Sequence, residues 1–197
     1  MEEIEIKFLG VDTAELEGKL VALGAKKSGD YRYRRAVFDY PDFRLDAQAA
    51  WLRLRDEGEK ITLTFKQRLG VKNGSLDGDD DGMYEKEIVV NDFEGTREIL
   101  LKTGLTEKMY QENKRTRYLL DGVECDIDTW PLLPPYLEIE GNSWEKVYAT
   151  AEKLGFKKED SKKFSTNQIY RLHGLDDRNF TKLTFEEQIE RVENRFE

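Results

Sequence analysis

Charged and apolar residues alternate in one predicted strand after another, and this pattern restricts the possible folds more than any other feature. Residues 3–8 read Glu-Ile-Glu-Ile-Lys-Phe. In a strand, this alternation puts the apolar side chains on one face and the charged ones on the other. The same alternation returns in segments 50–55, 61–68, 84–90, 109–120, 123–130 and 136–141. So many in-phase charges cannot all lie in a packed core, because unpaired buried charges are costly.

Consecutive predicted strands come in pairs between helices, which favours an antiparallel sheet over a parallel one. A further strand is expected at 31–40, and helices at 12–24, 91–102, 142–155 and 165–172. Thr184 and Glu187 resemble a capping box and predict a final amphipathic helix. We therefore expect an α+β protein: an eight-stranded antiparallel β-barrel with helices packed outside and a wet, charged interior. Residues 1–175 would form this tunnel domain, and 176–197 a helical extension of it.

The charged faces of these strands supply two sets of side chains for the predicted interior. The cations are Lys7, Arg53, Arg55, Lys66, Arg68, Arg115 and Arg117. The carboxylates are Glu3, Glu5, Glu85, Glu87, Asp126, Asp128, Glu138 and Glu140. Arginine binds phosphate oxygens well through its planar fork of donors. Carboxylates beside a phosphate chain would repel it unless a divalent metal lay between them, so the two sets together indicate a metal-bound polyphosphate.

Composition excludes several other classes of function. The net charge of −9 argues against a nucleic-acid surface built on bulk positive charge. No apolar run approaches the roughly 18 residues of a membrane span. One cysteine, Cys125, permits no internal disulfide, and the acidic start does not resemble a signal peptide, so we expect a cytoplasmic protein. A homodimer is left open.

The scarcity of histidine and cysteine narrows the chemistry further. With His173 as the single histidine beside Cys125, a zinc site built from these two residue types is excluded. Any bound metal should be a hard cation held by carboxylates, with Mg²⁺ or Mn²⁺ as our choice. Asp77, Asp79 and Asp81 match half of a calcium-loop pattern, but position twelve is Ile88, so we interpret 70–82 as a hairpin connection.

The ordered set of charged pairs resembles a known family. The segment Glu3 to Lys7 is similar to the ExExK signature of the CYTH superfamily, the triphosphate tunnel metalloenzymes. That family includes class IV adenylyl cyclases, thiamine triphosphatases and inorganic triphosphatases. The later pairs follow in order: Arg53-x-Arg55, Lys66-x-Arg68, Glu85-x-Glu87, Arg115-x-Arg117, Asp126-x-Asp128 and Glu138-x-Glu140. The resemblance covers about residues 1 to 172 and implies an eight-stranded tunnel.

The resemblance also implies roles for individual residues. Glu3, Glu5 and Lys7 would carry catalysis. Metal ligands would be Glu3, Glu5, Asp126, Glu138 and Glu140, and we add Asp128. Triphosphate would be bound by Lys7, Arg53, Arg55, Lys66, Arg68, Arg115 and Arg117. Members often carry a further lysine near the C-terminus, for which Lys163 is our choice and Lys162 the alternative.

We therefore expect a Mg²⁺- or Mn²⁺-dependent hydrolase of a small-molecule triphosphate, such as tripolyphosphate, a nucleoside triphosphate or thiamine triphosphate. One alternative is a class IV adenylyl cyclase, in which the 3′-hydroxyl of ATP attacks the α-phosphorus. Another is a non-catalytic sensor of polyphosphate or nucleotide. The sequence leaves open the organic part of the substrate and the number of metals.

Overall fold

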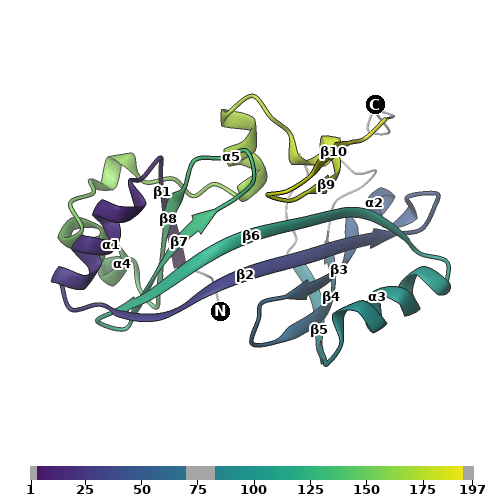
Figure 1. Ribbon diagram of the computed structural model, residues 1–197, viewed down its shortest axis with the longest axis horizontal. Helices are drawn as coiled ribbons and strands as arrows, with labels where there is room; N and C mark the ends of the chain where they lie inside the picture. The colour runs from purple at the N-terminus through teal and green to yellow at the C-terminus, as the bar shows by residue number, and fades with distance from the viewer. Residues whose placement is uncertain (1–3, 70–82, 193–197) are drawn as a thin grey trace. The chain divides into compact units, whose positions relative to one another are not determined.

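The computed structural model describes residues 4–69 and 83–192 (Figure 1). Glu3 and the aspartates of the 70–82 loop lie outside the described residues. The strands are β1 (Ile4–Leu9), β2 (Lys26–Asp39), β3 (Ala50–Asp56), β4 (Ile61–Arg68), β5 (Met83–Val90), β6 (Thr106–Leu120), β7 (Val123–Thr129), β8 (Tyr136–Gly141), β9 (Phe180–Leu183) and β10 (Gln188–Glu190). The helices are α1 (Thr13–Ala22), α2 (Arg44–Ala47), α3 (Phe93–Lys102), α4 (Trp144–Lys153) and α5 (Thr166–Leu172), with 3₁₀ turns η1 (Lys158–Asp160) and η2 (Asp177–Asn179).

The main sheet confirms the predicted α+β class and the large antiparallel sheet of eight ordered strands. Its order is β1-β8-β7-β6-β2-β3-β4-β5. The predicted closure into a barrel is wrong: β1 and β5 end this order, and within the described residues they do not pair with each other. The edge of β1 that does not pair with β8 is already hydrogen-bonded at Lys7. The backbone N–H of Lys7 donates to the carbonyl of Lys162 at 2.8 Å, and Lys162 returns the bond at 2.9 Å.

The chain divides into two compact units, which we describe separately. The first unit comprises Met1–Arg32 and Asn113–Asp177. The second unit comprises Tyr33–Glu112 and Arg178–Glu197. The long strands β2 and β6 each contribute residues to both units.

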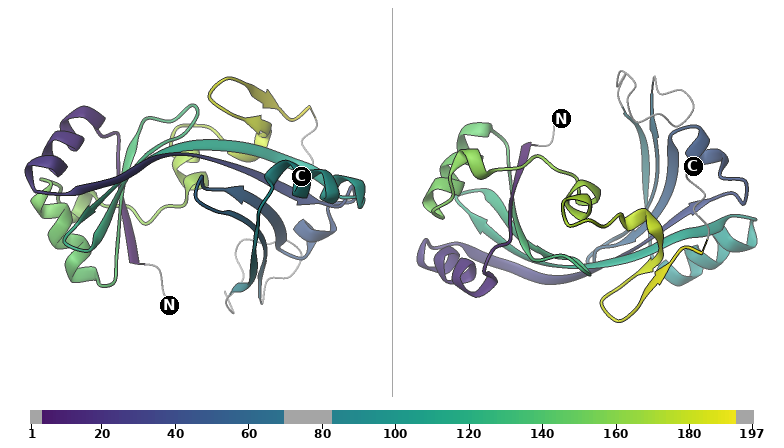
Figure 2. Two further views of the ribbon diagram at one scale, coloured as in Figure 1. Left: turned by 60° about the horizontal axis from the view of Figure 1, so that its bottom comes forward. Right: turned by 90° about the horizontal axis from the view of Figure 1, so that it is seen from above.

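In the first unit, helices α1 and α4 cover the apolar face of β1, β8, β7 and the end of β6 (Figure 2). Ile6, Leu20 and Ile139 are completely buried in this core, and burial of such side chains contributes about 1.5–3 kcal/mol each. Helix α1 begins where the Asp12 side chain accepts from the N–H of Glu15, and it ends before Gly24, whose φ of 82° suits glycine. The alternating residues of these strands therefore face away from the core.

In the second unit, helix α3 packs against the apolar face formed by β2, β3, β4 and β5. Ala36, Phe38, Leu54 and Phe93 are its fully enclosed residues. Arg34 belongs to this face too, because its guanidinium lies 4.2 Å from the centre of the Phe93 ring. The residues that alternate with these point to the opposite face of the sheet. None of the helices in the described ranges combines the length and apolar character needed to cross a membrane.

The predicted C-terminal helix is wrong as far as Val192, because the chain forms the short antiparallel hairpin β9–β10 instead. The Thr184 hydroxyl does accept from the N–H of Glu187 at 2.9 Å, as in a capping box. However, the Thr184 N–H also donates to the Glu187 carbonyl at 2.9 Å, which closes a turn. Leu183 is fully buried, and β9 pairs with β6 in parallel. The segment with the capping pattern thus forms a turn and not a helix, because β9 pairs with β10 and β6.

The buried thiol of Cys125 gives a first testable prediction. Cys125 has no exposed surface, and burial raises the pKa of its thiol to about 12. Because thiolate is the reactive form, we expect no reaction with Ellman's reagent at pH 8 until the protein is unfolded. The measurement is absorbance of the released thionitrobenzoate with and without denaturant. Rapid stoichiometric release from the folded protein would contradict this packing of β7.

Candidate active site

Two charged surfaces stand opposite the two apolar cores, one in each unit. In the first unit the strand register sets charged residues directly beside one another. Lys7, Glu138, Asp126 and Arg117 are successive partners across β1, β8, β7 and β6. In this row the two carboxylates are neighbours, and each has a cation on its other side.

Arg115 is held by three carboxylates at the centre of this surface. Its Nε donates to Asp128 at 2.8 Å, and its two terminal nitrogens lie 2.6 Å from Asp126 and 2.9 Å from Glu138. The Asp126 and Asp128 side chains are each 1% exposed. Carboxylates so deeply buried remain ionised only beside a cation. Arg115 therefore permits three acids to share one face of the sheet.

Lys7 links the same acids to β1. Its ammonium contacts Glu5 and lies 2.9 Å from Glu138. Burial alone would lower the pKa of Lys7, but Glu138 and Glu5 outweigh this effect and raise it. Burial likewise opposes ionisation of Glu138, but Arg115 and then Lys7 outweigh it and lower the Glu138 pKa. Both groups are therefore charged at neutral pH.

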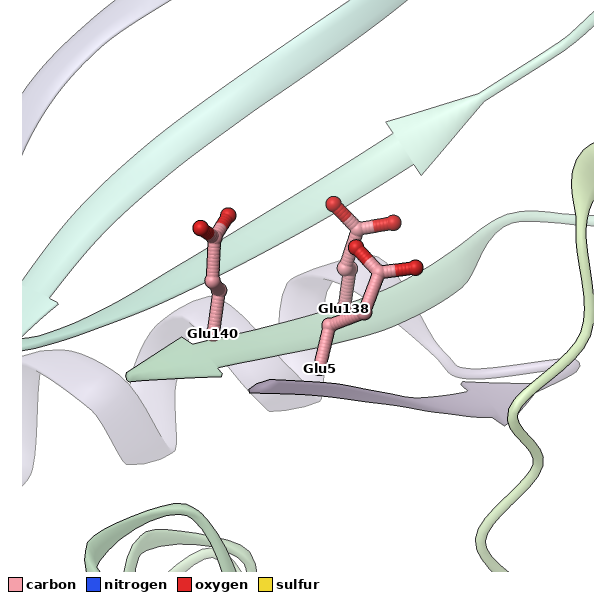
Figure 3. Close-up of side chains that lie close together, drawn as sticks. All are labelled: Glu5, Glu138 and Glu140. Atoms are coloured by element: carbon pink, nitrogen blue, oxygen red, sulfur yellow. The ribbon is translucent and has the colours of Figure 1, made fainter. Parts of the chain in front are cut away.

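In the next row of the register, the three residues on β1, β8 and β7 are all glutamates. Glu5, Glu140 and Glu124 are directly opposite one another on β1, β8 and β7. Like charges in such positions destabilise a sheet. One carboxylate oxygen from each of Glu5, Glu138 and Glu140 lies within 4.8 Å of the others, and Figure 3 shows the three side chains rising from the same face. Octahedral ligands of Mg²⁺ are about 3–4 Å apart, so small rotations of these side chains would fit a hard cation.

The predicted metal ligands thus fall into two groups in the structure. Glu5, Glu138 and Glu140 come together, whereas Asp126 and Asp128 are engaged by Arg117 and Arg115. Across β1, β8, β7 and the end of β6, six carboxylates (Glu5, Glu124, Asp126, Asp128, Glu138, Glu140) share the face with three cations (Lys7, Arg115, Arg117). The resulting excess of negative charge favours a bound cation.

In the second unit the charged surface is dominated by cations. Arg55 lies 2.9 Å from Glu57, and Lys66 lies 3.0 Å from Glu85. Arg53 makes no ion pair within 4.0 Å in the described ranges, and its buried Nε has no hydrogen-bond partner there. Burial, followed by the nearby Arg55, lowers the Arg53 pKa. An arginine in this condition marks a place where an anion would be stabilised.

The other predicted residues of this surface lie around these cations. Glu87 accepts from the Thr64 hydroxyl at 2.8 Å, beside Arg53 in the register. Arg68 follows Lys66 at the end of β4, on the same face by alternation. All of them belong to the second unit.

The two C-terminal lysines point in different directions. Lys162 is the direct antiparallel partner of Lys7, so its side chain shares the charged face. The ammonium of Lys163 lies 3.8 Å from the centre of the Trp144 ring on α4, which covers the apolar face. The geometry therefore favours Lys162 over Lys163 as the lysine that accompanies Lys7.

Two residues of the charged surfaces were not among the predicted sets. Glu124 shares the phase of Asp126 and Asp128 on β7, so alternation alone would have found it. Arg35 is the direct partner of Arg55 across β2 and β3. The orientation of Arg35 follows from the burial of Ala36 and Phe38. The apolar run 36–38 does not by itself show which of its residues are buried.

The comparisons with known proteins agree with this architecture. The family model described as CYTH domain matches residues 1–172. This chain belongs to the CYTH family. CYTH enzymes bind triphosphate substrates and depend on metal, and they are typically triphosphatases. Among curated protein sequences, none shows significant similarity to the chain.

Several solved structures share the CYTH fold. A protein from Pyrococcus horikoshii OT3 is 25% identical with a TM-score of 0.59, and the match covers 85% of this chain and 99% of that one. A candidate adenylate cyclase from Vibrio parahaemolyticus is 13% identical with a TM-score of 0.62, covering 85% and 96%. A candidate adenylyl cyclase from Hippeastrum, described as revealing a dominant triphosphatase activity, is 19% identical with a TM-score of 0.56, covering 87% and 96%.

The arrangement around Arg115 gives a prediction about stability. We expect Arg115→Met to lower the free energy of unfolding at pH 8 by about 3–5 kcal/mol, because buried carboxylates lose their cation. Burial already raises the pKa of Asp128 beside Arg115, and without Arg115 it would raise this pKa further above the unfolded value of about 3.9. The folded variant would then bind more protons than the unfolded chain, so its stability should rise as the pH falls toward 5. Urea titrations at both pH values, with chelator present, measure this.

Arg171→Met is the matched control for that experiment. Arg171 lies 3.3 Å from Asp176, but its side chain is 44% exposed. Loss of such a surface pair should cost no more than about 1 kcal/mol and should not depend on pH in this way. Equal losses in the two variants at pH 8 would show that the acids around Arg115 do not need it.

Proposed function

We propose that this CYTH protein is a divalent-metal-dependent hydrolase of a triphosphate. The observation that carries the proposal is the convergence of Glu5, Glu138 and Glu140 beside Lys7. Carboxylate oxygens are the ligands that Mg²⁺ and Mn²⁺ prefer. Membership of the family supports the triphosphate substrate.

In this proposal Glu5, Glu138 and Glu140 hold the cation. Glu3 lies two residues before Glu5 in the sequence. A divalent cation bound there would neutralise charge on the phosphate chain and polarise its phosphorus–oxygen bonds. Asp126 and Asp128 have a different task, because they are bound to Arg117 and Arg115. They fix these arginines in place.

Lys7 is the residue that connects the acids to the substrate. Its ammonium is held between Glu5 and Glu138, which supplies local positive charge. A divalent cation held by those glutamates would take over the charge that Lys7 now balances, and the Lys7 ammonium would then be able to contact a phosphate oxygen. Lys162, opposite Lys7, adds a second ammonium on the same face. Within the second unit, the cations Arg53, Arg55, Lys66 and Arg68 form a surface of their own that suits phosphate oxygens.

The proposed reaction is attack by water on the terminal phosphorus. The water oxygen forms a bond to phosphorus, and the bond from phosphorus to the bridging oxygen breaks, leaving its electron pair on the departing phosphate chain. A carboxylate accepts the proton of the water. Arg115 and Lys7 lower the pKa of Glu138, which makes this carboxylate a poor proton acceptor, so we assign the role to another carboxylate of this surface.

Product analysis with Mg²⁺ or Mn²⁺ tests the proposal. Purified protein is incubated separately with tripolyphosphate, ATP and thiamine triphosphate. Release of orthophosphate from any of them, lost on addition of chelator, is the expected result. Cyclic AMP with pyrophosphate from ATP would establish the cyclase instead. Binding of all three without turnover would favour a sensor.

A pair of glutamate variants tests which acids hold the metal. Glu140→Gln should shift the midpoint of the Mg²⁺ titration at fixed triphosphate upward by about tenfold or more, because a hard cation loses an anionic ligand. Glu124→Gln is the control, since Glu124 lies in the same row but pairs with Arg117 at 2.9 Å. Its midpoint should change little. If Glu124→Gln moves the midpoint as far as Glu140→Gln, the assignment of ligands is wrong.

A further inference from the structure

In one row of the second unit, three neighbouring side chains all carry hydrogen-bond donors. Arg35, Arg55 and Thr62 are direct partners across β2, β3 and β4. The Thr62 side chain is fully buried. Its hydroxyl and the Nε of Arg55 have no hydrogen-bond partner among the described residues. Buried polar groups are normally satisfied, so unsatisfied donors gathered in one row indicate a missing acceptor.

The side chain of Arg35 lies on the charged face, unlike that of its neighbour Arg34. Ala36 and Phe38 are buried in the core under α3, so Arg35 points away from that core. Arg34 points toward it, where it lies 3.0 Å from Asp56 and 2.8 Å from Glu94. Adjacent arginines of one strand therefore serve opposite faces.

Arg35 and Arg55 bring two like charges into direct cross-strand register, and Arg55 also lies 2.9 Å from Glu57. Direct cross-strand partners have Cβ atoms about 4.5–5.5 Å apart, and like charges there are destabilising. Arg53, one row further along β3, adds a third guanidinium to the same face. Together these residues offer fork-shaped donors suited to phosphate oxygens.

We propose that Arg35 is a further phosphate-binding residue, which completes a subsite with Arg55 and Thr62 for one end of a polyphosphate chain. The inference rests on the proposed function for its ligand class. Residues two apart in a strand are about 6.6–6.8 Å apart, so the rows from Arg55 through Arg53 to Trp51, whose partner is Lys66, span roughly 13 Å. An extended phosphate chain can engage several of these rows, whereas orthophosphate can reach only one.

The test is calorimetric binding of tripolyphosphate, with chelator present, to the full chain. Arg35→Met should weaken binding by about tenfold or more, as expected for a lost charge-assisted contact. The melting temperature without ligand should change less than in Arg34→Met, because Arg35 directly faces the like-charged Arg55. The rise in melting temperature on adding tripolyphosphate should shrink, and orthophosphate should change little in either protein.

Arg34→Met is the matched control. It should lower the melting temperature without ligand, because it loses Asp56, Glu94 and the Phe93 ring. Its affinity for tripolyphosphate should stay at the wild-type value. If Arg35→Met behaves in this way instead, with a lower melting temperature and unchanged affinity, Arg35 is structural and the proposal is wrong.

Further measurements distinguish a failure of this inference from a failure of the proposed function. Arg35→Lys keeps the charge but loses the fork, and should bind with intermediate affinity. If neither Arg35 variant folds, the residue is structural and the proposal fails. Wild-type protein that binds tripolyphosphate but hydrolyses none with Mg²⁺ or Mn²⁺ would overturn hydrolysis and leave the subsite standing. Wild-type protein that binds no tripolyphosphate would overturn both.

Discussion

The contact of Arg115 with Asp126, Asp128 and Glu138 is the interaction on which the acidic surface of the first unit depends. Without a buried cation, the sheet could not hold adjacent carboxylates from β7 and β8, because each would be forced to take up a proton. Arg115 occupies the two aspartates and still leaves Glu138 shared with Lys7. The carboxylate oxygens of Glu5, Glu138 and Glu140 thereby lie within 4.8 Å of one another. The same contact explains why carboxylate oxygens of the three glutamates, and not of the aspartates, come together in one cluster.

Alternation along single strands was enough to predict which residues face the charged surfaces. Ile6 and Ile139 are buried, while Lys7 and Glu138 lie on the opposite face, as their positions in the sequence indicate. Alternation carries no information on register, however. The register of β1 against β8 pairs Lys7 with Glu138 and Glu5 with Glu140. This register is fixed by tertiary packing. The division of the acids between those bound to arginines and those in the glutamate cluster therefore could not be predicted.

Contacts between distant segments, which alternation does not reveal, also explain the other differences between the sequence predictions and the structure. Thr184 and Glu187 make the hydrogen bond of a cap, but Leu183 is drawn into pairing beside Gln111 and the segment becomes a hairpin. Barrel closure depends on what happens at the outer edge of β1, where a residue distant in sequence, Lys162, takes both backbone hydrogen bonds of Lys7. Arg35 was missed because its phase is visible only once its neighbours are known to be buried. Each case turns on contacts between segments that are remote in the chain.

The position of Lys162 has a consequence for how this chain folds during synthesis. Strand β1 finds its partner β8 only when residues 136–141 have emerged from the ribosome, and its other edge is occupied at Lys7 only after residue 162 has followed. Contacts so distant in sequence form slowly because the intervening loop must first be closed. Until then an apolar strand edge is exposed, the kind of surface that chaperones exist to shield. The N-terminal signature is therefore among the last parts of the nascent protein to be secured.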